Sequence, residues 1–103
     1  MAIAVVTTFS GPTATAANYD DGIKKMGCFP GGTHPDPGCL FHWVETKHHE
    51  LRVTDVWKSE AHWNVFRDNI LTPSMAGGSL PAPDPSVTHE VHNYLTAGGL
   101  DPV

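Results

Sequence analysis

The chain has 103 residues, a common size for a single domain, which disfavours a two-domain enzyme. Its composition, 40% hydrophobic and 17% charged, is that of a folded globular protein. Six basic against eleven acidic residues give a formal net charge of -5, which argues against nucleic acid and anionic membranes as partners.

The first predicted element is a strand over residues 3–9, which are β-branched, aromatic or small. Residues 1–6 are apolar but lack the basic start of a signal peptide. No apolar run reaches the roughly 20 residues that span a membrane, so we expect a cytoplasmic protein. Thr13 is the expected N-cap of a helix that ends at Gly27, because apolar residues then recur at helical spacing: Ala16, Tyr19, Ile23 and Met26.

Two strands, 39–47 and 50–58, are expected to form a hairpin around His48-His49. Ser59 is the expected cap of a second helix that ends near Pro73, and five of its residues are expected to face inward: Ala61, Trp63, Phe66, Ile70 and Leu71. A last strand is expected over 86–95. Residues 1–97 are thus predicted to form one domain, and residues 98–103 a loose tail.

The predicted order β-α-β-β-α-β is that of the ferredoxin-like fold, in the α+β class. It implies a four-stranded antiparallel sheet with both helices on one face. Short connections and right-handed crossovers place the first and third strands at its centre.

A turn at His48-His49 places residues whose numbers sum to 97 opposite each other. On the more apolar face, which we assign to the core, this pairs Leu40 with Trp57 and His42 with Asp55. A buried histidine and carboxylate must satisfy each other, and their pairing would fix the imidazole tautomer and raise its basicity, as a general base requires. A purely structural pair that fixes the strand register is the equally weighted alternative.

The opposite face of the hairpin carries Phe41, Trp43 and Val56, an apolar patch with charged residues at its rim. Such patches mark interfaces, and two sheets packed face to face would form a twofold homodimer.

Alternation in the last strand places Val87, His89, Val91, Asn93 and Leu95 on one face, which we expect to point toward the helices. His89 and Asn93 therefore become candidate pocket residues.

The sequence supports neither a metal nor another cofactor. The seven histidines include no His-Glu-x-x-His motif, and His89 and His92, three apart on a strand, would point to opposite faces. Cys28 and Cys39 bracket a Pro/Gly-rich loop; they are expected to be free thiols in a reducing compartment, with a disulfide as the alternative in an oxidising one.

Several segments resemble the dimeric α/β-barrel superfamily, in particular small proteins related to antibiotic-biosynthesis monooxygenases. The similar segments are Tyr19-Asp20-Asp21, residues 37–42, residues 51–59, Phe66 and Val91-His92-Asn93. The resemblance implies a ferredoxin-like homodimer with a small-molecule pocket between sheet and helices. The superfamily includes cofactor-free oxygenases of aromatic polyketides, polyketide cyclases, haem-degrading enzymes and proteins without known activity.

Two functions follow as expectations. In the first, a cofactor-free enzyme uses His42 to remove a proton from a small apolar, aromatic or polyketide-like substrate and Asp55 to stabilise the imidazolium, leading to oxygenation or cyclisation. The expected ligand pocket comprises Tyr19, Leu40, Trp57, Phe66, His89 and Asn93. In the second, the protein is a non-catalytic homodimer that binds a small ligand. Trp57 resembles a tryptophan of the haem-degrading branch, but the first strand has no asparagine and His62 comes too early in its helix, so haem is not expected.

Overall fold

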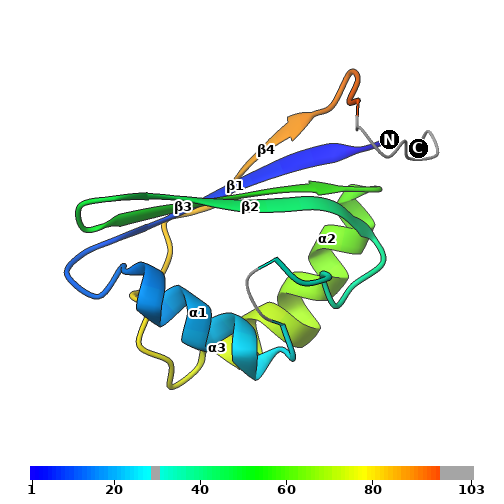
Figure 1. The fold of residues 1–103 in the computed structure, drawn as a ribbon. Helices are drawn as coiled ribbons and strands as arrows, with labels where there is room; N and C mark the ends of the chain where they lie inside the picture. The colour runs from blue at the N-terminus through cyan, green and yellow to red at the C-terminus, as the bar shows by residue number, and fades with distance from the viewer. Residues whose placement is uncertain (29–30, 96–103) are drawn as a thin grey trace.

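The computed structural model describes residues 1–28 and 31–95, so the tail predicted over 98–103 lies outside the described residues. One antiparallel sheet in the order β2-β3-β1-β4 forms the upper layer in Figure 1, and the helices lie beneath its lower face. This confirms the ferredoxin-like prediction, with the first and third strands central. The elements are β1 (Ile3–Ser10), α1 (Ala16–Lys25), β2 (Cys39–Lys47), β3 (Glu50–Trp57), α2 (Glu60–Phe66), the π-helical turn η1 (Arg67–Leu71), α3 (Thr72–Met75) and β4 (Val87–Glu90).

Helix α1 begins two residues later than the sequence suggests. Thr15, not Thr13, is the N-cap, and its hydroxyl accepts the backbone N–H of Asn18 at 3.2 Å. The expected stop at Gly27 is confirmed: Gly27 has a φ of +82°, and the N–H of Cys28 reaches back to the carbonyl of Ile23. The helix is therefore bounded at both ends by local hydrogen bonds.

The hairpin register is confirmed from Phe41 opposite Val56 to Lys47 opposite Glu50, with His42 opposite Asp55. The predicted pairing of Leu40 with Trp57 is wrong. Cys39 takes that place, because the ladder shifts by one residue between Cys39 and Phe41 and leaves Leu40 as the extra residue of a β-bulge.

The second helical segment starts as expected, with the Ser59 hydroxyl accepting the N–H of His62, and it runs through Pro73 to end at Met75. Within it, η1 widens the helix, and the N–H of Thr72 bonds to the carbonyl of Arg67, five residues back. A wider turn relieves the clash between a proline ring and the preceding turn, so the chain continues into α3. Trp63 and Phe66 face inward as predicted, whereas Ala61 is exposed.

Strand β4 is shorter than the predicted 86–95, and its faces are opposite to those expected. Thr88 pairs with the buried Val5, so Thr88 shares the helix-covered face, while His89 pairs with Ala4 on the other face. The sequence signal failed because every residue of β4 is exposed, and apolar alternation cannot mark the inner side of an exposed edge strand.

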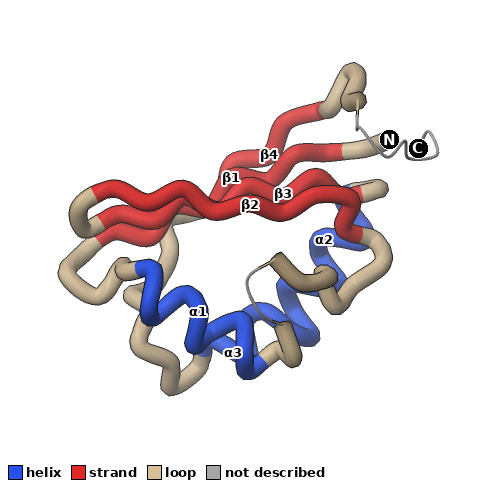
Figure 2. The backbone as a smooth tube through the Cα atoms, viewed as in Figure 1, coloured by secondary structure: helices blue, strands red, loops and turns tan. Residues whose placement is uncertain are grey.

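Two apolar clusters join the sheet to the helices. Trp57, which has no exposed surface, packs with Val5, Trp63 and Phe66 at one end of the sheet. Leu51 packs with Phe9 and Ala14 at the other end. The backbone of α1 and α3 is spaced away from the lower face of the sheet in Figure 2. In the described part of the chain, no helix is long and apolar enough to cross a membrane.

Candidate active site

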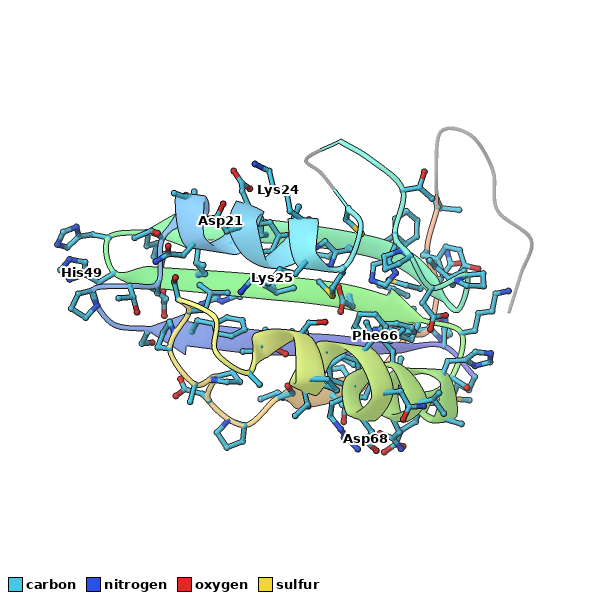
Figure 3. The ribbon with its side chains drawn as sticks, turned by 90° about the horizontal axis from the view of Figure 1, so that it is seen from below. Asp21, Lys24, Lys25, His49, Phe66 and Asp68 are labelled. Atoms are coloured by element: carbon cyan, nitrogen blue, oxygen red, sulfur yellow. The ribbon has the colours of Figure 1, made fainter. Side chains whose placement is uncertain are left out.

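A cavity of about 990 Å³ lies between the inner face of the sheet, the helices and the loop that precedes β2. Its wall is mainly apolar, with Phe9, Ile23, Val53, Phe66, Met75 and Leu80 among its residues. Figure 3 views the molecule from the helix side, with Phe66 toward the middle of the molecule and Asp68 at its outer edge. A cavity of this size suits a small organic molecule.

The polar centre of the cavity wall is the pair formed by His42 on β2 and Asp55 on β3. His42 Nδ1 lies 2.5 Å from Asp55 Oδ1. Asp55 is 6% exposed, so its charge must be compensated within the protein. Because a carboxylate can only accept, Nδ1 carries the proton that is donated to it, and the lone pair of the neutral ring is on Nε2.

Tyr19 of α1 completes a hydrogen-bonded chain across the cavity wall. Its hydroxyl lies 2.5 Å from His42 Nε2 and donates to that lone pair. Burial, followed by the charges of Asp55 and Asp20, raises the pKa of Tyr19 to about 12. Tyr19 therefore holds its proton at neutral pH and is a donor to His42, not a phenolate.

Trp57 stands behind the pair, within the core. Its indole Nε1–H donates to Asp55 Oδ2 at 3.4 Å, the oxygen that His42 does not use. The two carboxylate oxygens thus have separate donors, His42 from β2 and Trp57 from β3. These two hydrogen bonds fix the orientation of the Asp55 carboxylate toward His42.

A second histidine, His34, reaches the cavity from the loop before β2. Its ring lies 5.7 Å from that of His42 and 5.1 Å from that of Phe66, and it meets Trp57 edge-on at 5.4 Å. The N–H of Asp36 donates to His34 Nδ1 at 3.0 Å. Burial lowers the pKa of His34, so this ring is neutral at neutral pH.

Both cysteines are free thiols and both line the cavity. Cys39 Sγ donates to the carbonyl of Phe41 at 3.1 Å, and burial, followed by the charge of Asp55, raises the pKa of the Cys39 thiol. A thiol held protonated in this way is a poor nucleophile. Within residues 1–28 and 31–95, no group of three or more metal-ligating side chains could hold a metal ion.

The structure brings some of the candidate pocket residues together and leaves others apart. Tyr19, Leu40 and Phe66 line the cavity with His42 and Asp55. Trp57 contacts the cavity residues from the core side, as a support for Asp55. His89 lies instead beside a shallow depression with Ser59 and Glu60, away from the cavity, and Asn93 lies beyond the end of β4.

Sequence reasoning missed His34 and the hydrogen bond of Tyr19. His34 lies in an irregular loop, where no periodicity indicates which side chains point inward. Tyr19 was placed on the apolar stripe of its helix, and that position gives no information on where the hydroxyl goes. For His34, the usable signal in the sequence was the run Pro35-Asp36-Pro37-Gly38, whose residue types are typical of a tight turn. Such a turn keeps His34 close to the start of β2.

Solved structures of other proteins share this architecture. A candidate antibiotic biosynthesis monooxygenase from Chloroflexus aurantiacus superposes with a TM-score of 0.60 at 19% identity, over 91% of this chain and 97% of that one. A variant of SnoaB, a cofactor-independent oxygenase from Streptomyces nogalater, gives 0.63 at 12% identity, over 91% and 96%. The chain has the ferredoxin-like fold of these monooxygenase-like proteins. No protein-family model matches the chain, and no curated protein matches it significantly by sequence.

The same fold is found in a variant of MhuD that holds two manganese protoporphyrin IX molecules per active site, with a TM-score of 0.55 at 12% identity, over 94% of this chain and all of that one. Neither histidine that lines the cavity offers a free ring nitrogen to a haem iron. The lone pair of His42 Nε2 is occupied by the Tyr19 hydroxyl, and His34 Nε2 carries the proton that Nδ1 lacks. His62, on α2, is exposed and bonded to Ser59.

Proposed function

We propose that the protein is a cofactor-independent enzyme that removes a proton from a small, largely apolar, aromatic or polyketide-like substrate. The observation that carries the proposal is the chain Tyr19–His42–Asp55 in the wall of an apolar cavity. His42 is the base, and Asp55 stabilises the imidazolium that forms. Hydrogen-bonded bases in the wall of a concave pocket are typical of active sites.

Tyr19 determines how the proton reaches His42. The Tyr19 hydroxyl already donates a hydrogen bond to His42 Nε2, so the substrate cannot reach this nitrogen directly. The substrate instead gives its proton to the Tyr19 oxygen, while Tyr19 passes its own proton to Nε2. The substrate becomes an enolate or phenolate and His42 becomes an imidazolium, while Tyr19 is a neutral hydroxyl both before and after the transfer. Because the tyrosine oxygen gains one proton as it loses another, this relay is compatible with a pKa of about 12.

The anion has two productive fates. Addition of dioxygen at the activated carbon, followed by loss of water, converts a methylene into a carbonyl and consumes one O₂. Attack on an internal carbonyl instead closes a ring and consumes none. The shared fold with a cofactor-independent oxygenase supports oxygenation, whereas the cavity accommodates either outcome.

A test compound is anthrone, whose enol is an aromatic hydroxyl and whose oxygenation gives anthraquinone and water. The wild-type protein is expected to consume O₂ with anthrone, and His42→Ala to lose this activity by about 10²-fold or more. His48→Ala, at the exposed hairpin turn, is the matched control and should keep it. A folded His42→Ala protein with full turnover would overturn the proposal.

The competing function is a non-catalytic protein that binds a ligand in the same cavity. The His42–Asp55 pair would then be structural. Thermal shifts with quinol and polyketide-like compounds, measured together with turnover, separate the two functions. A compound that stabilises the wild type and His42→Ala equally, and that neither protein converts, would support this alternative.

We also propose that the chain forms a homodimer through the helix-free face of the sheet. Of the three residues expected to form the patch, Trp43 is 47% exposed and Phe41 is half-buried, whereas Val56 is only 8% exposed and contributes little to the surface. Part of this face is covered by the chain itself, since Tyr94 meets Phe41 edge-on at 5.7 Å. The remaining apolar surface needs a partner, and a second copy offers the same surface in twofold symmetry.

A further inference from the structure

The segment from His34 to Cys39 is held in place by its own hydrogen bonds. Asp36 is the organising residue: its carboxylate accepts the N–H of Gly38 at 2.8 Å, its carbonyl accepts the N–H of Cys39 at 3.1 Å, and its own N–H donates to His34. These bonds tie the histidine to the first residue of β2. His34 is therefore preorganised before any ligand binds.

The bond from Asp36 also fixes the tautomer of His34. Because Nδ1 accepts an N–H, it cannot carry a proton itself, so the neutral ring has its proton on Nε2. Among the described residues, no protein atom accepts a hydrogen bond from this Nε2. The ring is half-buried in the cavity wall, where an unpaired donor indicates a site for an acceptor on the ligand.

The two histidines are neighbours in the cavity wall and have opposite roles. The His42 ring, 5.7 Å away, receives a proton through Tyr19, whereas the His34 ring can only donate. Deprotonation through Tyr19 leaves the negative oxygen in the part of the cavity that His34 also lines, since both residues pack against the His42 ring. A neutral donor stabilises that oxygen without placing a second positive charge next to the imidazolium of His42.

We infer that His34 Nε2–H donates to the oxygen of the deprotonated substrate, and that the substrate is an aromatic or enolic hydroxyl compound bound as its anion. This inference rests on the proposed function, since it needs the proton acceptor at His42. The acidic group of the substrate is then an O–H on a flat ring. The aromatic side chains of His34, Phe66 and Tyr19 line the cavity where that ring would stack.

The probe is 4-nitrophenol, because its phenol and phenolate forms absorb at different wavelengths. The wild-type protein is expected to bind it largely as phenolate. In His34→Phe, which keeps a ring in the aromatic cluster but lacks the donor, the ratio of phenolate to phenol affinity should fall about 10-fold or more. Affinity for nitrobenzene, which has no acidic group, should change less than about 2-fold, and His48→Phe should behave as wild type.

His34→Gln is a second variant, whose amide N–H can replace the donor. It should retain more of the phenolate preference than His34→Phe, and it keeps the test decisive if the phenylalanine variant does not fold. His42→Ala should bind the probe as neutral phenol.

The outcomes separate the two proposals. Equal phenolate preference in the wild type and in both folded His34 variants, with loss in His42→Ala, overturns the role of His34 and leaves the proposed base intact. Binding as neutral phenol by the wild type overturns the proposed base and the inference together. Absence of binding by the wild type also overturns both.

Discussion

The indole nitrogen of Trp57 lies 3.4 Å from Asp55 Oδ2, the carboxylate oxygen that His42 leaves free. The two residues are two positions apart on β3, so their side chains leave the same face of the sheet. A tryptophan with no exposed surface thus completes the hydrogen bonding of a buried carboxylate.

Trp57→Phe keeps an aromatic ring in the core but removes this donor. Leaving a buried carboxylate oxygen unpaired is expected to lower the free energy of unfolding by about 1–3 kcal/mol, measured by urea denaturation. Trp63→Phe is the matched control, because Trp63 packs in the same cluster without donating to Asp55. An equal loss in both variants would mean that packing alone accounts for the effect.

Asp55→Asn is expected to keep the shape of the site but to remove the tautomer of His42 that accepts a proton. The amide can donate to His42 Nδ1, which moves the ring proton to Nε2 and removes the lone pair that faces Tyr19. Turnover of anthrone should fall by roughly 10²–10⁴-fold. Asp68→Asn, an exposed residue paired with Arg67, should leave turnover unchanged. Comparable rates for the two variants would count against the His42–Asp55 mechanism.

The pairing of His42 with Asp55 was predictable because the hairpin combines strong alternation with a defined turn. A one-residue slip would have moved every side chain of one strand to the other face. The same rule failed at Leu40, where a bulge adds one residue, and at β4, where an exposed edge strand carries no apolar signal.

The rest of the site depends on contacts between elements that are distant in sequence. Tyr19 and His42 are 23 residues apart, and nothing in the spacing of α1 determines that the hydroxyl meets Nε2. His34 reaches the cavity through backbone bonds within an irregular loop. Sequence periodicity describes which face a side chain occupies, not which polar atom it meets across a cavity.

Tyr19 should make stability depend on pH in the alkaline range. Its pKa is raised from 10.0 to about 12 by burial first and by Asp55 second, so the folded state keeps the proton at pH values where the unfolded chain has lost it. This contribution is complete below pH 10.0 and is lost as the pH rises toward 12. Denaturation at a series of alkaline pH values should show the decline in wild type and in Tyr94→Phe, and a flatter profile in Tyr19→Phe. An identical profile in all three would place the Tyr19 hydroxyl in solvent.

Trp43→Glu tests the helix-free face of the sheet as a dimer interface. A charge at the centre of an apolar interface is costly to bury, so light scattering should report about twice the 11.1 kDa chain mass for the wild type and a single chain for the variant. Val65→Glu, on the exposed side of α2, should remain dimeric. A monomeric wild type at high micromolar concentration would refute the proposed homodimer.

Two glycines are expected to respond in opposite ways to alanine. At Gly22, within α1, an added Cβ would lie 3.9 Å from Leu80 Cδ1, an ordinary contact, so Gly22→Ala should stabilise the protein by about 0.5–1 kcal/mol through helix propensity. At Gly38 the added Cβ would lie 2.7 Å from His62 Cδ2 and 3.1 Å from Asp36 Oδ1.

Gly38→Ala should therefore destabilise the protein by about 1–3 kcal/mol in urea denaturation, because His62 and the Asp36 turn must shift. The same shift would disturb the bond from Asp36 to His34, so the phenolate preference toward 4-nitrophenol should fall along with stability. His48→Phe, at the exposed hairpin turn, serves as the control for probe binding, which it should leave unchanged. Loss of stability in Gly38→Ala with full phenolate preference would show that His34 does not depend on this turn for its position.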